Sequence, residues 1–157
     1  MKRHDSLIPL THDHHHALAQ ARALKLAASR GGEDRLRQSR EFLDFFETET
    51  KNHFREEEEV VFPLVVQEPE AKPVLERAML DHLRIHALIR SLKVEVETGA
   101  IDDGTPSKVA DALARHIRFE EKVVFPLIER ILTVEALDAI SLHSRKRSDP
   151  LHGNGQE

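Results

Sequence analysis

Apolar positions recur every three or four residues along most of the chain, and no stretch alternates apolar and polar positions between hairpin turns. This period is typical of amphipathic helices, so the fold class is predicted to be all-α. We expect four long helices, at about Thr11 to Arg30, from Glu33 into VVFPLVVQ, from Pro69–Pro73 to Gly99, and from Thr105 to Ile131.

Residues with special backbone preferences define the expected boundaries. Thr105 is a candidate N-cap with Pro106 at the first helical position, and Thr133 begins a shorter fifth helix. Residues 148–157 have the composition of a disordered tail. We therefore expect a single domain over residues 1–147.

Four helices joined by short connections predict an up-down-up-down four-helix bundle, in which successive helices are antiparallel neighbours. The short C-terminal fifth helix is expected to cover one end or flank of the bundle rather than to form a dimer contact. We expect a monomer or a weak dimer.

One stretch of the sequence occurs twice. Residues 53–63 read HFREEEEVVFP, and residues 116–126 read HIRFEEKVVFP. Upstream, Asp13-His14 aligns with Asp81-His82. The bundle is therefore predicted to be a duplicated helix hairpin.

The repeated stretch places a histidine four residues before a glutamate, so the two side chains share one helix face. His53 with Glu57 and His116 with Glu120 lie on the apolar faces of their helices. Glu56 is intermediate and stays a possible substitute for Glu57. The other acids of the stretch point away and are expected to form a solvated acidic edge: Glu58, Glu59 and Glu121.

Three further histidines lie on inward stripes, His14 on the first helix and His82 and His86 on the third. A single histidine in such a stripe is more often a hydrogen-bonded core residue than a ligand. Seven ionisable groups facing one core, however, would cost several kcal/mol each unless something neutralised them. Two cations would resolve this conflict.

The amino-acid composition limits the possible metal ligands and excludes some classes of function. The chain has no cysteine, which leaves nitrogen and oxygen ligands, and these suit iron, zinc, manganese or copper. The absence of tyrosine excludes a phenolate ligand. A net charge of -5 with scattered basic residues argues against nucleic-acid binding, and no apolar run is long enough to span a membrane. We expect a cytoplasmic protein.

The motifs resemble those of the hemerythrin family, specifically its cytoplasmic bacterial HHE cation-binding domains. The matching pieces are LTHDH ending at His14, HFREE from His53, HLRIH from His82 and HIRFE from His116. They follow the family's order over roughly residues 10 to 130. The resemblance implies two non-heme iron ions joined by a bridging oxo or hydroxo group.

The resemblance also assigns the ligands. It implies that one iron is bound by His82, His86 and His116, that the other is bound by His14 and His53, and that Glu57 and Glu120 bridge them. The vacancy on the second iron is where the family's oxygen carriers bind O2. One departure concerns Glu120, which follows its histidine by four residues, whereas the invertebrate carriers have an aspartate at five.

Two functions of different classes follow. The favoured hypothesis is a protein that binds or senses O2, or a related small ligand such as nitric oxide or peroxide. The alternative is a di-iron redox enzyme acting on peroxide or nitric oxide, or an iron-handling protein. A purely structural metal is disfavoured because structural sites tend to be closed.

Overall fold

The structure is a computed structural model that describes residues 2–148, and within that range the chain is helical without a strand. The first half contains η1 (Asp5–Leu7), α1 (Ile8–Arg30), α2 (Gly32–Phe45), η2 (Phe46–Thr50), α3 (Lys51–Glu56), η3 (Glu57–Val61) and η4 (Phe62–Leu64). The second half contains α4 (Lys72–Thr98), α5 (Gly104–Phe119), η5 (Glu120–Val124), α6 (Phe125–Ile131) and α7 (Val134–Ser148).

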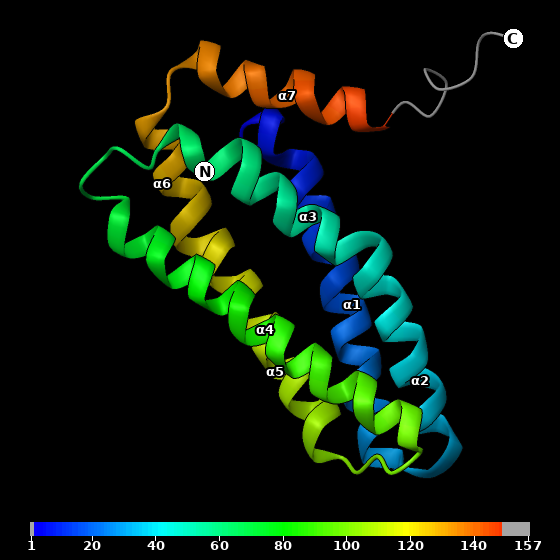
Figure 1. Ribbon diagram of the computed structural model, residues 1–157. Coiled ribbons are helices and arrows are strands. Elements are labelled where there is room, and N and C mark those ends of the chain that lie inside the picture. The colour runs from blue at the N-terminus through cyan, green and yellow to red at the C-terminus, as the bar shows by residue number, and fades with distance from the viewer. Residues whose placement is uncertain (1, 149–157) are drawn as a thin grey trace, which may run out of the picture.

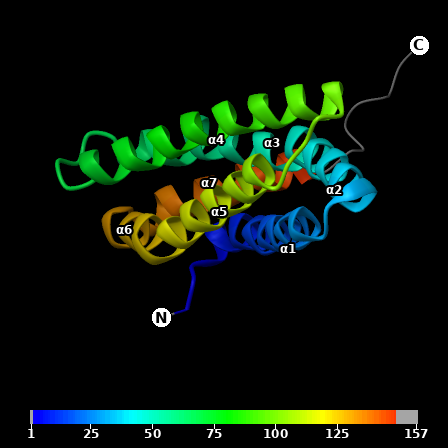
Figure 2. The ribbon, with the colours of Figure 1, turned by 90° about the horizontal axis from the view of Figure 1, so that it is seen from below.

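The long helices form a closed bundle. Helix α1 packs against α2 and α5, and α4 packs against α5 and α2. The segments from α2 to η3 follow one another without a break, so they act as one long helix (Figure 1). The turns that join α1 to α2 and α4 to α5 lie at the same end of the bundle (Figures 1 and 2).

Two apolar clusters fill the interior, one toward each end. Along α1, Leu10 belongs to the first cluster and Ala17 to the second, with His14 between them. On α4, the same order gives Ala78 and then Ile85. Every long helix therefore carries a short polar interval between two apolar stretches, and the intervals meet inside the bundle.

Three turns of the long helices are π-helical, namely η2, η3 and η5. The last two start at Glu57 and Glu120, which are equivalent positions of the sequence repeat. A π-helical turn closes its hydrogen bond over five residues instead of four and often occurs at functional sites. The repeat therefore extends to an unusual backbone feature.

The expected N-cap of α5 is wrong by two residues. The helix begins at Gly104 with Asp103 as its N-cap residue. The N–H of Gly104 donates to the Asp102 carboxylate at 2.8 Å, which closes the turn before Thr105 is reached. The Thr105 hydroxyl instead donates to Glu95 at 2.9 Å and ties α5 to α4.

Helix α7 lies across one end of the bundle, beside η1 (Figure 1). The hydroxyl oxygen of Thr133, the residue before α7, accepts the N–H of Ala136 at 3.2 Å. Except for Ser148, the last residue of α7, the predicted tail at 148–157 lies outside the described residues. Within the described part of the chain, no helix has the length and apolar character that a membrane span requires.

Replacing Gly99 with alanine should destabilise the fold. Gly99 ends α4 with φ +73°, in the left-handed region, and a Cβ there would meet no atom within 4 Å. The cost is therefore one of backbone conformation and should be about 1 to 2 kcal/mol. Urea denaturation of Gly99→Ala measures it, and an unchanged midpoint would contradict the expectation.

Candidate metal centre

Four buried histidines meet in the polar interval of the bundle. His14 comes from α1, His53 from α3, His82 from α4 and His116 from α5. The Nε2 atoms of His14 and His53 lie 3.0 Å apart, and those of His82 and His116 are also 3.0 Å apart. The rings thus form two pairs, each with its Nε2 atoms pointing inward.

Glu57 and Glu120 lie between the two histidine pairs. One oxygen of Glu57 is 2.8 Å from His53 Nε2, and the other is 3.3 Å from His82 Nε2. Glu120 repeats this arrangement, at 2.9 Å from His14 and 2.9 Å from His116 through its two oxygens. Each carboxylate therefore contacts both pairs.

The carboxylate oxygens are fully buried, and none has a hydrogen bond of acceptable geometry to any described residue. Leaving ionised oxygens in this state costs several kcal/mol unless a cation compensates. All four histidines and both glutamates contribute a ligand atom to these clusters of nitrogen and oxygen donors. This donor set fits metal ions that accept nitrogen and oxygen ligands.

Two overlapping groups of ligand atoms result. His14 and His53 form one with Glu57 and Glu120, and His82 and His116 form the other with the same two glutamates. Within each group the ligand atoms lie within 4.8 Å of one another. Each group could hold a metal ion, and the two groups share both carboxylates.

Each histidine also has a carboxylate at its outer nitrogen. His53 Nδ1 lies 3.0 Å from Asp13, and His116 Nδ1 lies 3.5 Å from Asp81. A carboxylate at this position fixes the tautomer and orientation of a ligand ring and raises its basicity. Asp13 and Asp81 were visible in the sequence as part of the repeat, but not with this role.

Glu58 and Glu121 hold the other two rings, so the expectation that they form a solvated edge is wrong. Glu58 accepts from His82 Nδ1 at 2.7 Å, and Glu121 accepts from His14 Nδ1 at 2.6 Å. The expectation assumed α-helical register, which is interrupted here because both residues lie within π-helical turns. Glu59 is exposed, as predicted.

Glu121 is further held by the amino-terminal segment. Thr11 donates its hydroxyl proton to Glu121 at 2.8 Å, and Arg3 forms an ion pair with it at 2.8 Å. The Arg3 guanidinium also lies over the ring of Phe125, which stacks on His14. Residues near the start of the chain therefore help to position the His14 ring in the second turn of α1.

Charge compensation shifts the pKa values of the central groups. Burial lowers the pKa of His53, but the nearby Glu57 carboxylate and the hydrogen bond to Asp13 raise it to about 9. Burial lowers the pKa of His82, but its contacts with the negatively charged Glu120 and Glu57 carboxylates outweigh burial and raise it to about 10. Burial and the Glu120 charge raise the pKa of Glu57, but His53 and His14 outweigh them and lower it to about 2.

Two other candidate ligands lie outside both groups. His86 is half-buried, with its ring 5.6 Å from that of Phe46 and 5.9 Å from that of Phe54. Burial is the main cause of the lowered pKa of His86. Glu56 is buried but does not join the ligand atoms, whereas Glu57 does. The structure thus brings together six of the seven predicted ligands, and His86 as a ligand stays a prediction.

The metal-free protein should lose stability as the pH rises. The raised pKa values of His53 and His82 mean that their stabilisation is complete below about 6.5 and is lost as the pH passes about 9 and about 10. Urea denaturation of chelator-treated protein at pH 6 and pH 9 measures this loss. Equal or greater stability at pH 9 would contradict it. Metal-loaded protein is the control, because bound ions hold the rings neutral.

Removing Glu58 should weaken metal binding by about 10- to 100-fold, because the His82 ring would lose the partner that orients it. Chelator competition with ferrous iron under anaerobic conditions measures the affinity of Glu58→Ala. The matched control is Glu59→Ala, which removes the next carboxylate along the helix, an exposed one paired with Arg55. Equal affinities of the two variants would show that Glu58 has no such role.

Comparison with known proteins agrees with this geometry. The family model described as the hemerythrin HHE cation binding domain matches residues 7–128. No curated protein and no solved structure gives a significant match. The matched range contains both ligand groups and all four carboxylates that hold the outer ring nitrogens. The chain belongs to the hemerythrin HHE cation-binding domain family.

Proposed function

We propose that this protein is a non-heme di-iron protein that binds or senses O2, or a related small ligand such as nitric oxide or peroxide. The observation that carries the proposal is the sharing of Glu57 and Glu120 between two ligand groups. A mononuclear site would not need two carboxylates that both contact both histidine pairs. We also propose that the bundle of this chain has the up-down-up-down topology of the family.

In this proposal the two irons have unequal ligand sets. His14 and His53 would bind one iron, and His82 and His116 would bind the other. Glu57 and Glu120 would be shared, and an oxo or hydroxo group would complete the centre. His86 would be the third histidine of the second iron. His86 follows His82 by four residues on α4. Its ring would have to move away from the Phe46 and Phe54 rings to bind that iron.

The ferrous pair would supply the electrons that reduction of a bound ligand such as O2 requires. The protein's own residues control what surrounds that pair. The Nδ1–H groups of the four histidines donate hydrogen bonds to carboxylates, so the Nε2 atoms stay directed inward. These carboxylates belong to Asp13, Glu58, Asp81 and Glu121. Phe54 stacks on His82 at 3.9 Å between ring centroids, and Phe125 stacks on His14 at 5.2 Å, which limits water near the ligand atoms.

The first test is the iron content per chain, combined with optical spectra recorded without oxygen and after air is admitted. We expect two irons and absorption bands that appear in air and disappear when O2 is removed. Glu57→Ala and Glu120→Ala should each lose one or both irons, while Glu59→Ala should keep both. These losses follow because each shared carboxylate belongs to both ligand groups.

Other outcomes would change the assignment. Bands that do not reverse, or turnover of added peroxide or nitric oxide, would favour the redox enzyme. A protein that takes up no iron, or a single zinc, would contradict the di-iron proposal. Full iron content in Glu57→Ala and Glu120→Ala would show that the shared carboxylates are not ligands.

A further inference from the structure

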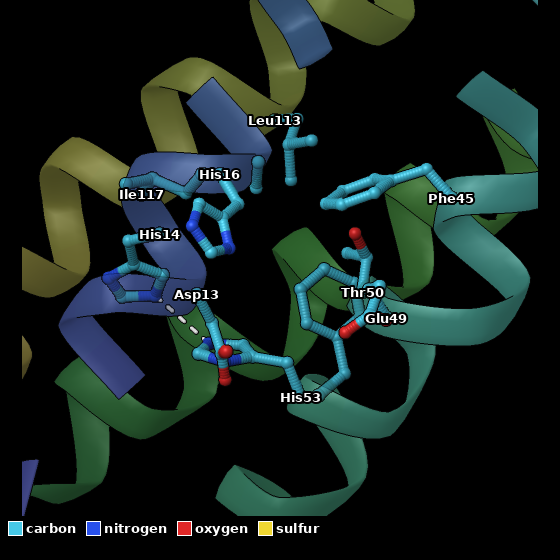
Figure 3. A pocket seen from close by; sticks show the side chains of 11 residues that line it. Asp13, His14, His16, Phe45, Glu49, Thr50, His53, Leu113 and Ile117 are labelled. Atoms are coloured by element: carbon cyan, nitrogen blue, oxygen red, sulfur yellow. Dashed lines mark hydrogen bonds and ion pairs between the residues drawn. The ribbon is translucent and has the colours of Figure 1, made fainter. Parts of the chain in front are cut away.

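A small cavity lies against the histidine pair of α1 and α3. His14 and His53 form one side of it, and Phe45, Leu113 and Ile117 contribute apolar surface (Figure 3). The space open to the centre of a water-sized molecule is about 20 Å³. Holding one water requires roughly 10 to 15 Å³ by this measure, so the cavity suits a ligand of two or three atoms.

Thr50 supplies a hydroxyl group to the lining of this cavity (Figure 3). Thr50 is only 3% exposed, and its Oγ1 has no hydrogen-bond partner among the residues that the structure describes. A buried hydroxyl without a partner destabilises a fold unless a ligand or water completes it. The cavity therefore contains a hydrogen-bond donor that is unpaired within residues 2–148.

Thr50 differs from the neighbouring threonine of the same π-helical turn. Threonine in a helix commonly donates to the carbonyl four residues earlier, and the neighbouring Thr48 does so to Asp44 at 2.9 Å. Thr50 ends the π-helical turn η2, where the Phe46 carbonyl accepts the N–H of Lys51 instead. The same helix thus contains one threonine with its usual partner and one without it.

The sequence repeat shows that this position does not require a hydroxyl for packing. The offset of 63 residues that relates His53 to His116 relates Thr50 to Leu113, which is also buried and lines the same cavity. In the second half the equivalents of Asp13 and His53, which are Asp81 and His116, border a much wider groove of about 560 Å³. The small cavity with a hydroxyl is thus a feature of the His14 and His53 side.

We propose that Thr50 is a positioning residue that donates a hydrogen bond to the outer atom of a small ligand bound beside His14 and His53. The inference rests on the proposed function and adds a selectivity to it. Ligands whose outer atom accepts a hydrogen bond, such as O2, nitric oxide or the azide ion, gain affinity from the hydroxyl. Thr50 acts on the ligand and not on the metals.

Azide binding to the oxidised, iron-loaded protein tests the proposal, because the terminal nitrogen of azide accepts a hydrogen bond. Thr50→Val removes the hydroxyl and keeps the shape, so we expect two irons, an azide affinity about 3- to 10-fold lower, and a shifted azide stretching frequency in the infrared spectrum. Thr50→Ser keeps the hydroxyl and should retain the affinity. Thr48→Val is the matched control and should bind azide as the unaltered protein does.

The stability of the metal-free protein gives a second measurement that does not depend on iron. Thr50→Val should unfold at the same urea concentration as the unaltered protein or a higher one, because it removes an unpaired polar group. A clearly lower midpoint would show that the hydroxyl serves the fold and would overturn the proposal.

The two proposals fail in different ways. Unchanged azide affinity and infrared frequency in Thr50→Val with two irons would reject the role of Thr50 and leave the di-iron function intact. An unaltered protein without two irons, or one that binds no azide, would reject the di-iron ligand site and with it the role of Thr50.

Discussion

The structure depends on the burial of Glu57 and Glu120 beside each other in a space that water does not reach. Two carboxylates in a medium of low polarity repel each other and lose their hydration. Within the described part of the chain, no hydrogen bond to their oxygens compensates for these two costs. Four imidazoles surround them and balance the charge in the absence of metal. The apolar clusters on both sides keep the space dry, and the four outer carboxylates hold the rings in place.

Much of the site could be predicted because its main ligands follow the helical period over a single turn. His53 with Glu57 and His116 with Glu120 are four residues apart, so any helix through them brings each pair to one face. The repeat added the information that the two pairs belong to one arrangement. His14 and His82 followed from their places in apolar stripes, where a polar residue is conspicuous.

The remaining features depend on contacts between helices and on backbone geometry, for which the sequence carries little signal. Glu58 and Glu121 were placed by α-helical register, but π-helical turns begin one residue before them, and each meets a ring from another helix. Thr105 is a residue type common at N-caps, but α5 begins before it. Asp103 is the N-cap residue, and the Asp102 carboxylate accepts the N–H of Gly104. The position of the His86 ring depends on packing against Phe46 and Phe54, which spacing along one helix does not predict.

Two of the four outer carboxylates cross between the two halves of the repeat, whereas Asp13 and Asp81 each hold a ring of their own half. Glu58 from the first half holds His82 of the second, and Glu121 from the second holds His14 of the first. Neither hairpin therefore contains all the carboxylates that hold its own histidine rings. The segment between η4 and α4 that joins the halves supplies none of these groups. Its contribution is to raise the effective concentration of one hairpin near the other, so that assembly of the centre is intramolecular.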